Sequence, residues 1–209
     1  MNTVTYIARD LAIVVTAYLV GSLPCSYIVG RIAGGVDIRT VGSGNMGATN
    51  VLRTVGPVPA LFAFLGDSLK AVALLLVLIH CFPTVSREAV LMASVAVILG
   101  HDFSVFAGFR GGKGVAATFG VVLVLSWPVG LVELGVWCIV MALRQTVSLA
   151  SIVSLATLPL VALLLREPPK LALIYALLAM LGIVRHSANI RRLMAGTEAR
   201  LDMSSFRRR

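Results

Sequence analysis

Residues 57–82 read PVPALFAFLGDSLKAVALLLVLIHCF, an apolar run that contains one acidic and one basic side chain, Asp67 and Lys70. A helix needs about 20 apolar residues to cross the hydrocarbon core of a bilayer, so this run can span a membrane. Pro83 follows it and helps to end the helix. An unpaired charge at mid-bilayer costs roughly 2.5–3.5 kcal/mol, and residues three apart share a helical face. We therefore expect a transmembrane helix in which Asp67 and Lys70 form an ion pair.

The whole chain has the composition of a membrane protein. Of its 209 residues, 58% are hydrophobic and 13% are charged, with a mean hydropathy of +0.96. Soluble domains carry about 25% charged residues, so a soluble globular class is excluded. We expect an all-α, polytopic helical bundle that forms a single transmembrane domain over residues 1–209. Seven spans are predicted, at residues 5–32, 57–82, 88–103, 115–127, 129–143, 146–165 and 170–184.

Two of the predicted regions are irregular. The first span contains Gly-Ser-Leu-Pro at residues 21–24, where proline predicts a kink. Residues 115–143 form an apolar stretch that is too long for one span and too short for two full ones. Trp127-Pro128 lies near its midpoint, and tryptophan favours the membrane interface. We therefore expect two short helices that meet at this turn.

Lysine and arginine residues predict the orientation in the membrane. With seven spans, thirteen of them fall on one side and four on the other. Cytoplasmic loops carry an excess of these residues, which places the larger group and the C-terminus in the cytoplasm and the N-terminus outside. Topology and anionic lipid thus explain the net charge of +9, and no nucleic acid partner is expected. The cytoplasmic group is Arg31, Arg39, Arg53, Arg110, Lys113, Arg144, Arg185, Arg191, Arg192, Arg200, Arg207, Arg208 and Arg209, and the outer group is Arg9, Arg87, Arg166 and Lys170.

The loop between the first two spans contains GSGNMGATN at residues 42–50, followed by Arg53. Glycines allow successive N–H groups to converge on an anion, and hydroxyl, amide and guanidinium groups add donors that suit phosphate. The loop matches GxGxxG, but a dinucleotide fold needs a preceding strand, and here an apolar helix precedes it. We therefore interpret it as a phosphate-binding loop; the alternative is a plain connector.

A second glycine-rich loop contains Arg110-Gly111-Gly112-Lys113-Gly114. It does not fit the P-loop pattern, which requires glycine at Ala107 and a hydroxyl at Gly114. Exposed N–H groups, a lysine and the start of a helix at Val115 still favour an anion site. The alternative is a positive anchor at the membrane edge. His101-Asp102, at the end of the third span, either orients this loop or caps a helix.

The basic tail begins with His186-Ser187-Ala188-Asn189, and on a helix His186 and Asn189 share a face. The alternative is a juxtamembrane helix that touches anionic lipid. No His-x4-Asp, Ser/His/Asp or metal-ligand pattern is present, so we expect no metal and no cofactor. Glu133 has no assigned role. We expect the cysteines to be small core residues; they are Cys25, Cys81 and Cys138.

Three segments together resemble the bacterial membrane glycerol-3-phosphate acyltransferases that use acyl phosphate, the PlsY family. They are GSLP…DIRTVGSGNMGATNVLRTVG at 21–56, GHDFSVFAGFRGGKGVAATFG at 100–120 and HSANIRRLMAGTE at 186–198. The resemblance implies acyl transfer from fatty acyl phosphate to the sn-1 hydroxyl of glycerol 3-phosphate, which gives lysophosphatidate in the first step of phospholipid synthesis. It also implies a multi-pass protein of the bacterial inner membrane with its active site on the cytoplasmic face. The implied partners are these two substrates and membrane lipid, and contact with the enzyme that makes acyl phosphate is left open.

Residue by residue, the resemblance places Ser43, Thr49, Asn50, Arg53, Lys113, His186 and Asn189 at active-site positions. We assign catalytic roles to His186, Asn189 and Ser43. We assign substrate binding to Gly42, Gly44, Asn45, Thr49, Asn50, Arg53, Arg110, Gly112 and Lys113.

Two departures from the family pattern concern the second loop. Ser104 stands where proline is usual, which we expect to loosen the loop, and Arg110 stands where lysine is usual and keeps the charge.

Two other classes of function compete with the enzyme. A transporter or channel for a phosphorylated solute would use the same cations but needs polar residues along the spans, which offer few besides Asp67, Lys70 and Glu133. A structural lipid-binding scaffold leaves the chemistry of the loops unexplained.

Overall fold

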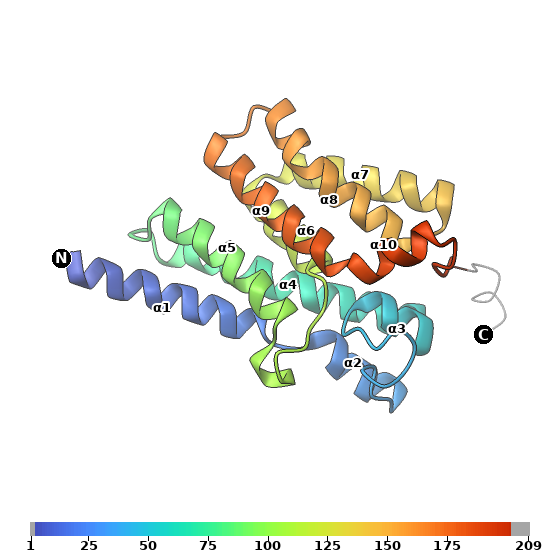
Figure 1. Ribbon diagram of the computed structural model, residues 1–209. Coiled ribbons are helices and arrows are strands. Elements are labelled where there is room, and N and C mark those ends of the chain that lie inside the picture. Colours follow the sequence, from blue (N-terminus) through green and yellow to red (C-terminus); the bar gives the residue numbers. More distant parts are fainter. Residues whose placement is uncertain (1–2, 202–209) are drawn as a thin grey trace. The chain divides into compact units, whose positions relative to one another are not determined.

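The computed structural model describes residues 3–201, and every regular element in this range is a helix. The chain folds as two compact units, Met1–Val124 and Leu125–Arg209; a single domain over residues 1–209 stays a prediction. The first unit contains α1 (Thr3–Gly21), α2 (Cys25–Gly34), α3 (Ala48–Thr54), α4 (Pro57–Cys81), α5 (Arg87–Asp102), the short 3-10 helix η1 (Val105–Ala107) and α6 (Val115–Leu125) (Figure 1). The second contains α7 (Trp127–Arg144), α8 (Val147–Leu164), α9 (Pro169–Arg185) and α10 (Ser187–Met194).

The all-α membrane fold is confirmed, with fewer helices of full spanning length than seven. α6 has 11 residues, about 16 Å at 1.5 Å per residue, against a hydrocarbon core of about 30 Å. A sixth span exists if α9 and α10, bent by 61°, are taken as one. The orientation of the termini stays a prediction, and Arg207, Arg208 and Arg209 lie outside the described residues. The five helices that can cross a membrane by length and composition are Thr5–Gly34, Pro57–Cys81, Arg87–Ala107, Trp127–Arg144 and Val147–Leu164.

The predicted kink in the first span is confirmed as a break between α1 and α2. Pro24 has no N–H group and precedes α2, so the break frees backbone carbonyls inside the membrane segment. Side chains from elsewhere in the unit satisfy them. The hydroxyl of Ser104 donates to the carbonyl of Ser22 at 2.5 Å, and the ammonium of Lys70 donates to that of Leu23 at 2.8 Å. The break is therefore a built feature of the fold.

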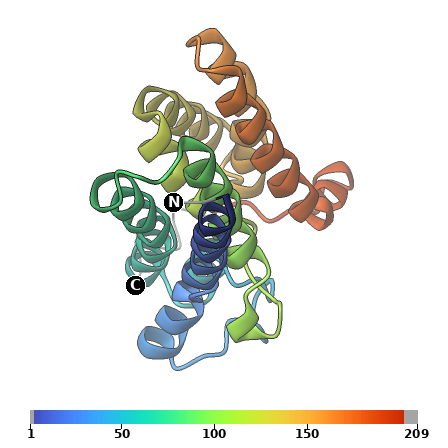
Figure 2. The same ribbon diagram turned by 90° about the vertical axis from the view of Figure 1, so that its left-hand side faces the viewer.

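Helix α1 packs along α5 at very short range, and the two run side by side in both views (Figures 1 and 2). A Cβ atom on Gly21 would lie 2.0 Å from the carbonyl oxygen of Val97, and one on Gly100 would lie 2.1 Å from that of Tyr18. Only glycine allows backbones to approach this closely. The hydroxyl of Tyr18 also donates to the carbonyl of Phe103 at 2.6 Å, which holds the end of α5 against the helix break.

In the second unit, α7 and α8 pack through a polar seam. The carboxylate of Glu133 on α7 accepts hydrogen bonds from Ser154 at 2.8 Å and Thr157 at 3.1 Å on α8. The indole of Trp137 lies 3.3 Å from the hydroxyl of Ser151. Residues 151, 154 and 157 recur every third position, a spacing that places them on one helical face. Glu133, which the sequence left unassigned, thus joins two helices.

The prediction that the cysteines are core residues is wrong for two of the three. All three are free thiols; Cys25 is half-buried, whereas Cys81 and Cys138 are exposed on their helices. In a membrane protein an apolar run has an outer face as well as a buried one, and the apolar pattern alone does not distinguish the two.

Candidate active site

The first glycine-rich loop is organised by the side chain of Asn50, which is only 1% exposed. Its amide nitrogen donates to the carbonyls of Ile38 at 2.6 Å and Val41 at 3.1 Å. Its oxygen accepts the N–H of Ser43 at 2.9 Å. An asparagine amide has two N–H donors, and both are used within the loop. Asn50, expected as a substrate ligand, is therefore placed to hold the loop in shape.

The rest of the loop is anchored on both sides of this amide. Gly42 and Gly44 have φ angles of 61° and 68°, a left-handed conformation that favours glycine, and a Cβ on Gly42 would lie 2.3 Å from the amide oxygen of Asn50. Met46 is buried in an apolar cluster that includes Ile38. Anchored this way, the loop leaves Ser43 exposed, with Asn45, Thr49 and Arg53 half-buried.

Two other cations near this loop are engaged by a carboxylate. Asp37 accepts hydrogen bonds from Arg39 at 2.8 Å and from Arg31 at 2.9 Å. Both guanidinium groups also lie over the ring of Tyr27, at 5.5 Å for Arg31 and 4.8 Å for Arg39. The hydrogen bonds from Arg39 hold the pKa of Asp37 well below its usual range. These contacts engage both guanidinium groups with Asp37 and Tyr27.

The second glycine-rich loop lies directly against the end of α5. The N–H of Gly112 donates to the carbonyl of His101 at 3.1 Å. A Cβ on Gly111 would lie 2.1 Å from that carbonyl oxygen, and one on Gly112 would lie 2.1 Å from the Nε2 atom of the His101 ring. The glycines are therefore needed for close packing, a reason that the sequence did not reveal. Lys113 is half-buried and stands just before α6, whereas Arg110 is exposed.

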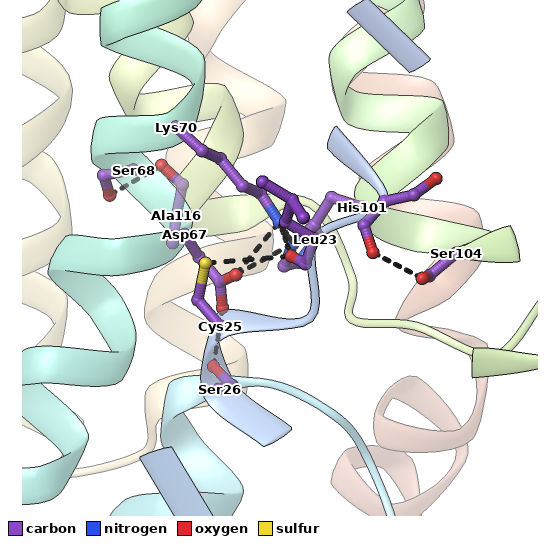
Figure 3. Close-up of polar contacts among 10 residues, drawn as sticks. Leu23, Cys25, Ser26, Asp67, Ser68, Lys70, His101, Ser104 and Ala116 are labelled. Atoms are coloured by element: carbon purple, nitrogen blue, oxygen red, sulfur yellow. Dashed lines mark hydrogen bonds and ion pairs between the residues drawn. The ribbon is translucent and has the colours of Figure 1, made fainter. Parts of the chain in front are cut away.

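Ser104 does not loosen this loop as expected. Its side chain is 2% exposed and ties the start of the loop to the carbonyl of Ser22 (Figure 3). The carbonyl of Ser104 in turn accepts the N–H of Phe109 at 2.7 Å. The reason is chemical, because a serine hydroxyl supplies a donor that a proline ring lacks.

A buried cluster of charged and polar side chains joins α2, α4 and α5 (Figure 3). The carboxylate of Asp67 accepts hydrogen bonds from Ser26 at 2.6 Å and from Lys70 at 3.1 Å. The ammonium of Lys70 also lies 3.1 Å from Nδ1 of His101. The predicted ion pair is thus confirmed, and it extends to a histidine at the edge of the second glycine-rich loop.

His186, at the junction of α9 and α10, is held as one tautomer. Its Nδ1 lies 2.7 Å from the carbonyl oxygen of Gly182, one helical turn earlier. A carbonyl only accepts, so Nδ1 carries the hydrogen. In the neutral ring Nε2 then carries the lone pair and can accept a proton or a hydrogen bond. This assignment gives His186 the chemistry that a base or a hydroxyl-orienting group requires.

Asn189 is fixed by a carboxylate from the segment that follows α10. Its amide nitrogen donates to Glu198 at 2.7 Å, and Glu198 also accepts hydrogen bonds from Ser148 at 2.8 Å and from Arg192 at 2.6 Å. Burial alone would raise the pKa of Glu198, but these hydrogen bonds lower it below its ordinary value. Glu198 was assigned no role from the sequence, although it lies among several arginines in the tail.

The predicted site residues fall into two groups, one in each compact unit. The two glycine-rich loops belong to the first unit, and His186 and Asn189 belong to the second. Over residues 3–201, no group of three or more His, Cys, Asp or Glu side chains is placed to hold a metal ion.

Comparison with known proteins gives the family. Residues 11–196 match the family model described as glycerol-3-phosphate acyltransferase. The chain is 40% identical to glycerol-3-phosphate acyltransferase 2 of Thermotoga maritima, covering 90% of this chain and 95% of the relative. It is 46% identical to the glycerol-3-phosphate acyltransferase of Paramagnetospirillum magneticum, with coverage of 88% and 90%.

Solved structures agree with this match. The crystal structure of PlsY (YgiH), an integral membrane glycerol 3-phosphate acyltransferase, in its glycerol 3-phosphate form superposes with a TM-score of 0.87 at 36% identity. That similarity covers 94% of this chain and 98% of PlsY. The lysophosphatidic acid form of PlsY gives a TM-score of 0.85 at 34% identity, with coverage of 96% and 100%. Since the matches extend over nearly the whole length of both partners, this chain belongs to the glycerol-3-phosphate acyltransferase family.

Proposed function

We propose that this protein transfers a fatty acyl group from acyl phosphate to the sn-1 hydroxyl of glycerol 3-phosphate, releasing lysophosphatidate and inorganic phosphate. The observation that carries the proposal is the end-to-end similarity to PlsY, which has solved structures in a glycerol 3-phosphate form and a lysophosphatidic acid form. These are the acceptor and the product of the proposed reaction. The acyl phosphate donor follows from the motif resemblance and is part of the proposal.

The chemistry asks for positioning more than for strong base catalysis. The acceptor hydroxyl oxygen attacks the acyl carbonyl carbon, a new C–O bond forms, and the C–O bond to the phosphate breaks. Acyl phosphate is a mixed anhydride, so inorganic phosphate is already a good leaving group. The protein has to hold two anionic substrates in line and stabilise the charge that develops on the carbonyl oxygen.

We assign the phosphate groups of the substrates to the two glycine-rich loops. Arg53 provides a planar guanidinium that can hold two phosphate oxygens at once, and Lys113 provides a compact positive charge next to the N-terminus of α6. Ser43 adds an exposed hydroxyl on the loop that Asn50 shapes. In this assignment Asn50 acts by holding the loop.

We assign the acceptor hydroxyl to His186 and Asn189. The lone pair on Nε2 of His186 suits a hydroxyl donor, and the contact with Glu198 leaves the amide oxygen of Asn189 as the acceptor end. The hydroxyl proton can go to His186 Nε2 or to a phosphate oxygen of a substrate. His186→Gln separates the two routes, because glutamine can accept the hydroxyl hydrogen bond but cannot take the proton. Retained turnover in His186→Gln would indicate the phosphate route, and loss of turnover would indicate the histidine route.

We also propose that the protein acts in the bacterial inner membrane, with both glycine-rich loops at the cytoplasmic face. The uneven distribution of lysine and arginine supports this orientation. A transporter has less support, because the polar side chains in the spans that a solute path would need are bonded to neighbours. Asp67 bonds to Ser26, and Glu133 bonds to Ser154.

The decisive experiment uses the purified protein in detergent with palmitoyl phosphate and glycerol 3-phosphate, following phosphate release and lysophosphatidate formation. We expect release to require both substrates and to give one lysophosphatidate per phosphate. Palmitoyl-CoA at the same concentration is the matched donor control. Equal turnover with palmitoyl-CoA would refute the donor assignment, and absence of lysophosphatidate would refute the acyltransferase proposal.

A further inference from the structure

One edge of the His101 ring lies against the buried ion pair of Lys70 and Asp67. An ammonium group has three N–H donors and no acceptor, and the nitrogen of Lys70 has three neighbours: the carbonyl of Leu23 at 2.8 Å, Asp67 at 3.1 Å and Nδ1 of His101 at 3.1 Å. Nδ1 of His101 also lies 3.4 Å from the same carboxylate oxygen of Asp67. The ring is therefore held in one orientation by a buried ion pair.

The other edge of this ring forms a wall for the second glycine-rich loop. Nε2 is the atom that a Cβ on Gly112 would approach to 2.1 Å, and the carbonyl of the same histidine receives the N–H of Gly112 at 3.1 Å. Ring and carbonyl of His101 thus contact the residue next to Lys113. No larger residue than glycine fits between them.

We propose that His101, held by Lys70 and Asp67, is a positioning residue that sets the path of the second glycine-rich loop and thereby the place of Lys113. The inference rests on the proposed function only in giving Lys113 a phosphate to bind. Buried charges inside a membrane segment are costly and mark functional regions. Here Lys70 and Asp67 hold the ring of His101, the ring limits the position of Gly112, and Gly112 directly precedes Lys113. A displacement of about 1 Å at a reacting group can reduce the rate about 100-fold.

The test is a pair of double-mutant cycles measured as kcat/KM for glycerol 3-phosphate and as Tm in detergent. Gly112→Ala should be severe in the native protein, because its methyl group meets the His101 ring. In the His101→Ala background the ring is gone, so Gly112→Ala should lower Tm and kcat/KM much less than it does in the native protein. Gly111→Ala is the matched control. Its methyl group would meet the backbone of His101 and Asp102, so it should be equally severe in both backgrounds.

A second cycle separates positioning from general stability. If His101 acts through Lys113, His101→Ala should cost about 100-fold in the native protein and little more once Lys113→Ala has removed the charge. His101→Asn, whose side-chain oxygen can accept a hydrogen bond from Lys70, should restore Tm relative to His101→Ala. It should leave kcat/KM low, because the ring that packs against Gly112 is still missing.

Two results would overturn the proposal: an equal penalty for Gly112→Ala with and without the His101 ring, or additive effects of His101→Ala and Lys113→Ala. The Tm cycle needs no substrate. It therefore tests the contact between ring and loop even if the native protein shows no acyltransferase activity, an outcome that would refute the proposed function separately.

Discussion

Replacing Asn50 should disable the first glycine-rich loop without unfolding the protein. Asn50 makes three hydrogen bonds inside the loop, to the carbonyls of Ile38 and Val41 and from the N–H of Ser43. A typical net contribution is about 1 kcal/mol per bond, so Asn50→Ala removes about 3 kcal/mol from the loop conformation. At 1.4 kcal/mol per decade this corresponds to a loss of about 100-fold in kcat/KM.

Asn50→Asp is the sharper variant because it keeps the shape of the side chain. The two N–H donors become an oxygen that faces two carbonyl oxygens in a buried site, and leaving each carbonyl without a donor costs about 1–3 kcal/mol. We therefore expect Asn50→Asp to be less active than Asn50→Ala. A residue that only contacted substrate phosphate would also suffer from the added negative charge, so activity alone does not separate the two roles.

Proteolysis in the absence of substrate separates them. If Asn50 holds the loop, limited proteolysis around residues 39–47 should accelerate in Asn50→Ala before any ligand is added. Thr40→Val is the control, since it lies in the same exposed loop and loses a single hydrogen bond to the carbonyl of Asp37. If Asn50→Ala has low activity but resists proteolysis as well as the native protein does, the loop-holding role is refuted. Asn50 would then be assigned to substrate binding instead.

Three further predictions concern charge, topology and pH. Lys113→Ala should lower kcat/KM roughly 10- to 150-fold, the range for a charge-assisted hydrogen bond of about 1.5–3 kcal/mol. Arg200→Ala, which removes an exposed cation in the tail, should leave kcat/KM nearly unchanged. Equal losses in the two variants would mean that Lys113 is a positive anchor at the membrane edge and does not bind phosphate. In whole cells a membrane-impermeant thiol reagent should label a cysteine at Thr84 but reach one at Ser187 only in inverted vesicles, and labelling of both from outside would contradict the orientation. The pKa of Glu198 is lowered from its ordinary value of 4.5, so its contribution to stability is complete above pH 4.5 and is lost as the pH falls through the folded-state pKa. Tm should drop over this acid range in the native protein and drop less in Glu198→Gln. Identical pH profiles of Tm for the two proteins would contradict this role of Glu198.

The sequence predicted well those features that depend on local chemistry. Proline after Gly-Ser-Leu correctly predicted the break between α1 and α2, and two opposite charges three residues apart correctly predicted a buried ion pair. Both follow from the geometry of one helix and from the cost of an unpaired charge in lipid. Neither requires knowledge of what packs against the helix.

What the sequence could not predict depends on segments that are distant along the chain. Asn50 has the same donors whether it binds phosphate or the carbonyl of Ile38, and only the folded loop shows which one is used. Gly112 satisfies the pattern of an anion-binding loop, yet its lack of a side chain is explained by the His101 ring. In both cases a residue type that suits ligand binding is also the type needed to hold a loop close to its support.

The buried charges of the first unit are best understood as consequences of the helix break. A break inside a membrane exposes carbonyl groups, and each unsatisfied one costs several kcal/mol in hydrocarbon. Ser104 satisfies Ser22, and Lys70 satisfies Leu23. A buried ammonium then requires a counter-charge, which Asp67 supplies, and the second oxygen of Asp67 requires a donor, which Ser26 supplies from the start of α2. Each side chain thus supplies the hydrogen bond or the counter-charge that the preceding group requires. The helix break and the buried charges therefore stabilise one another. Since Ser104 begins the second glycine-rich loop and α2 leads into the first, the same set of bonds ties both loops to the helix break.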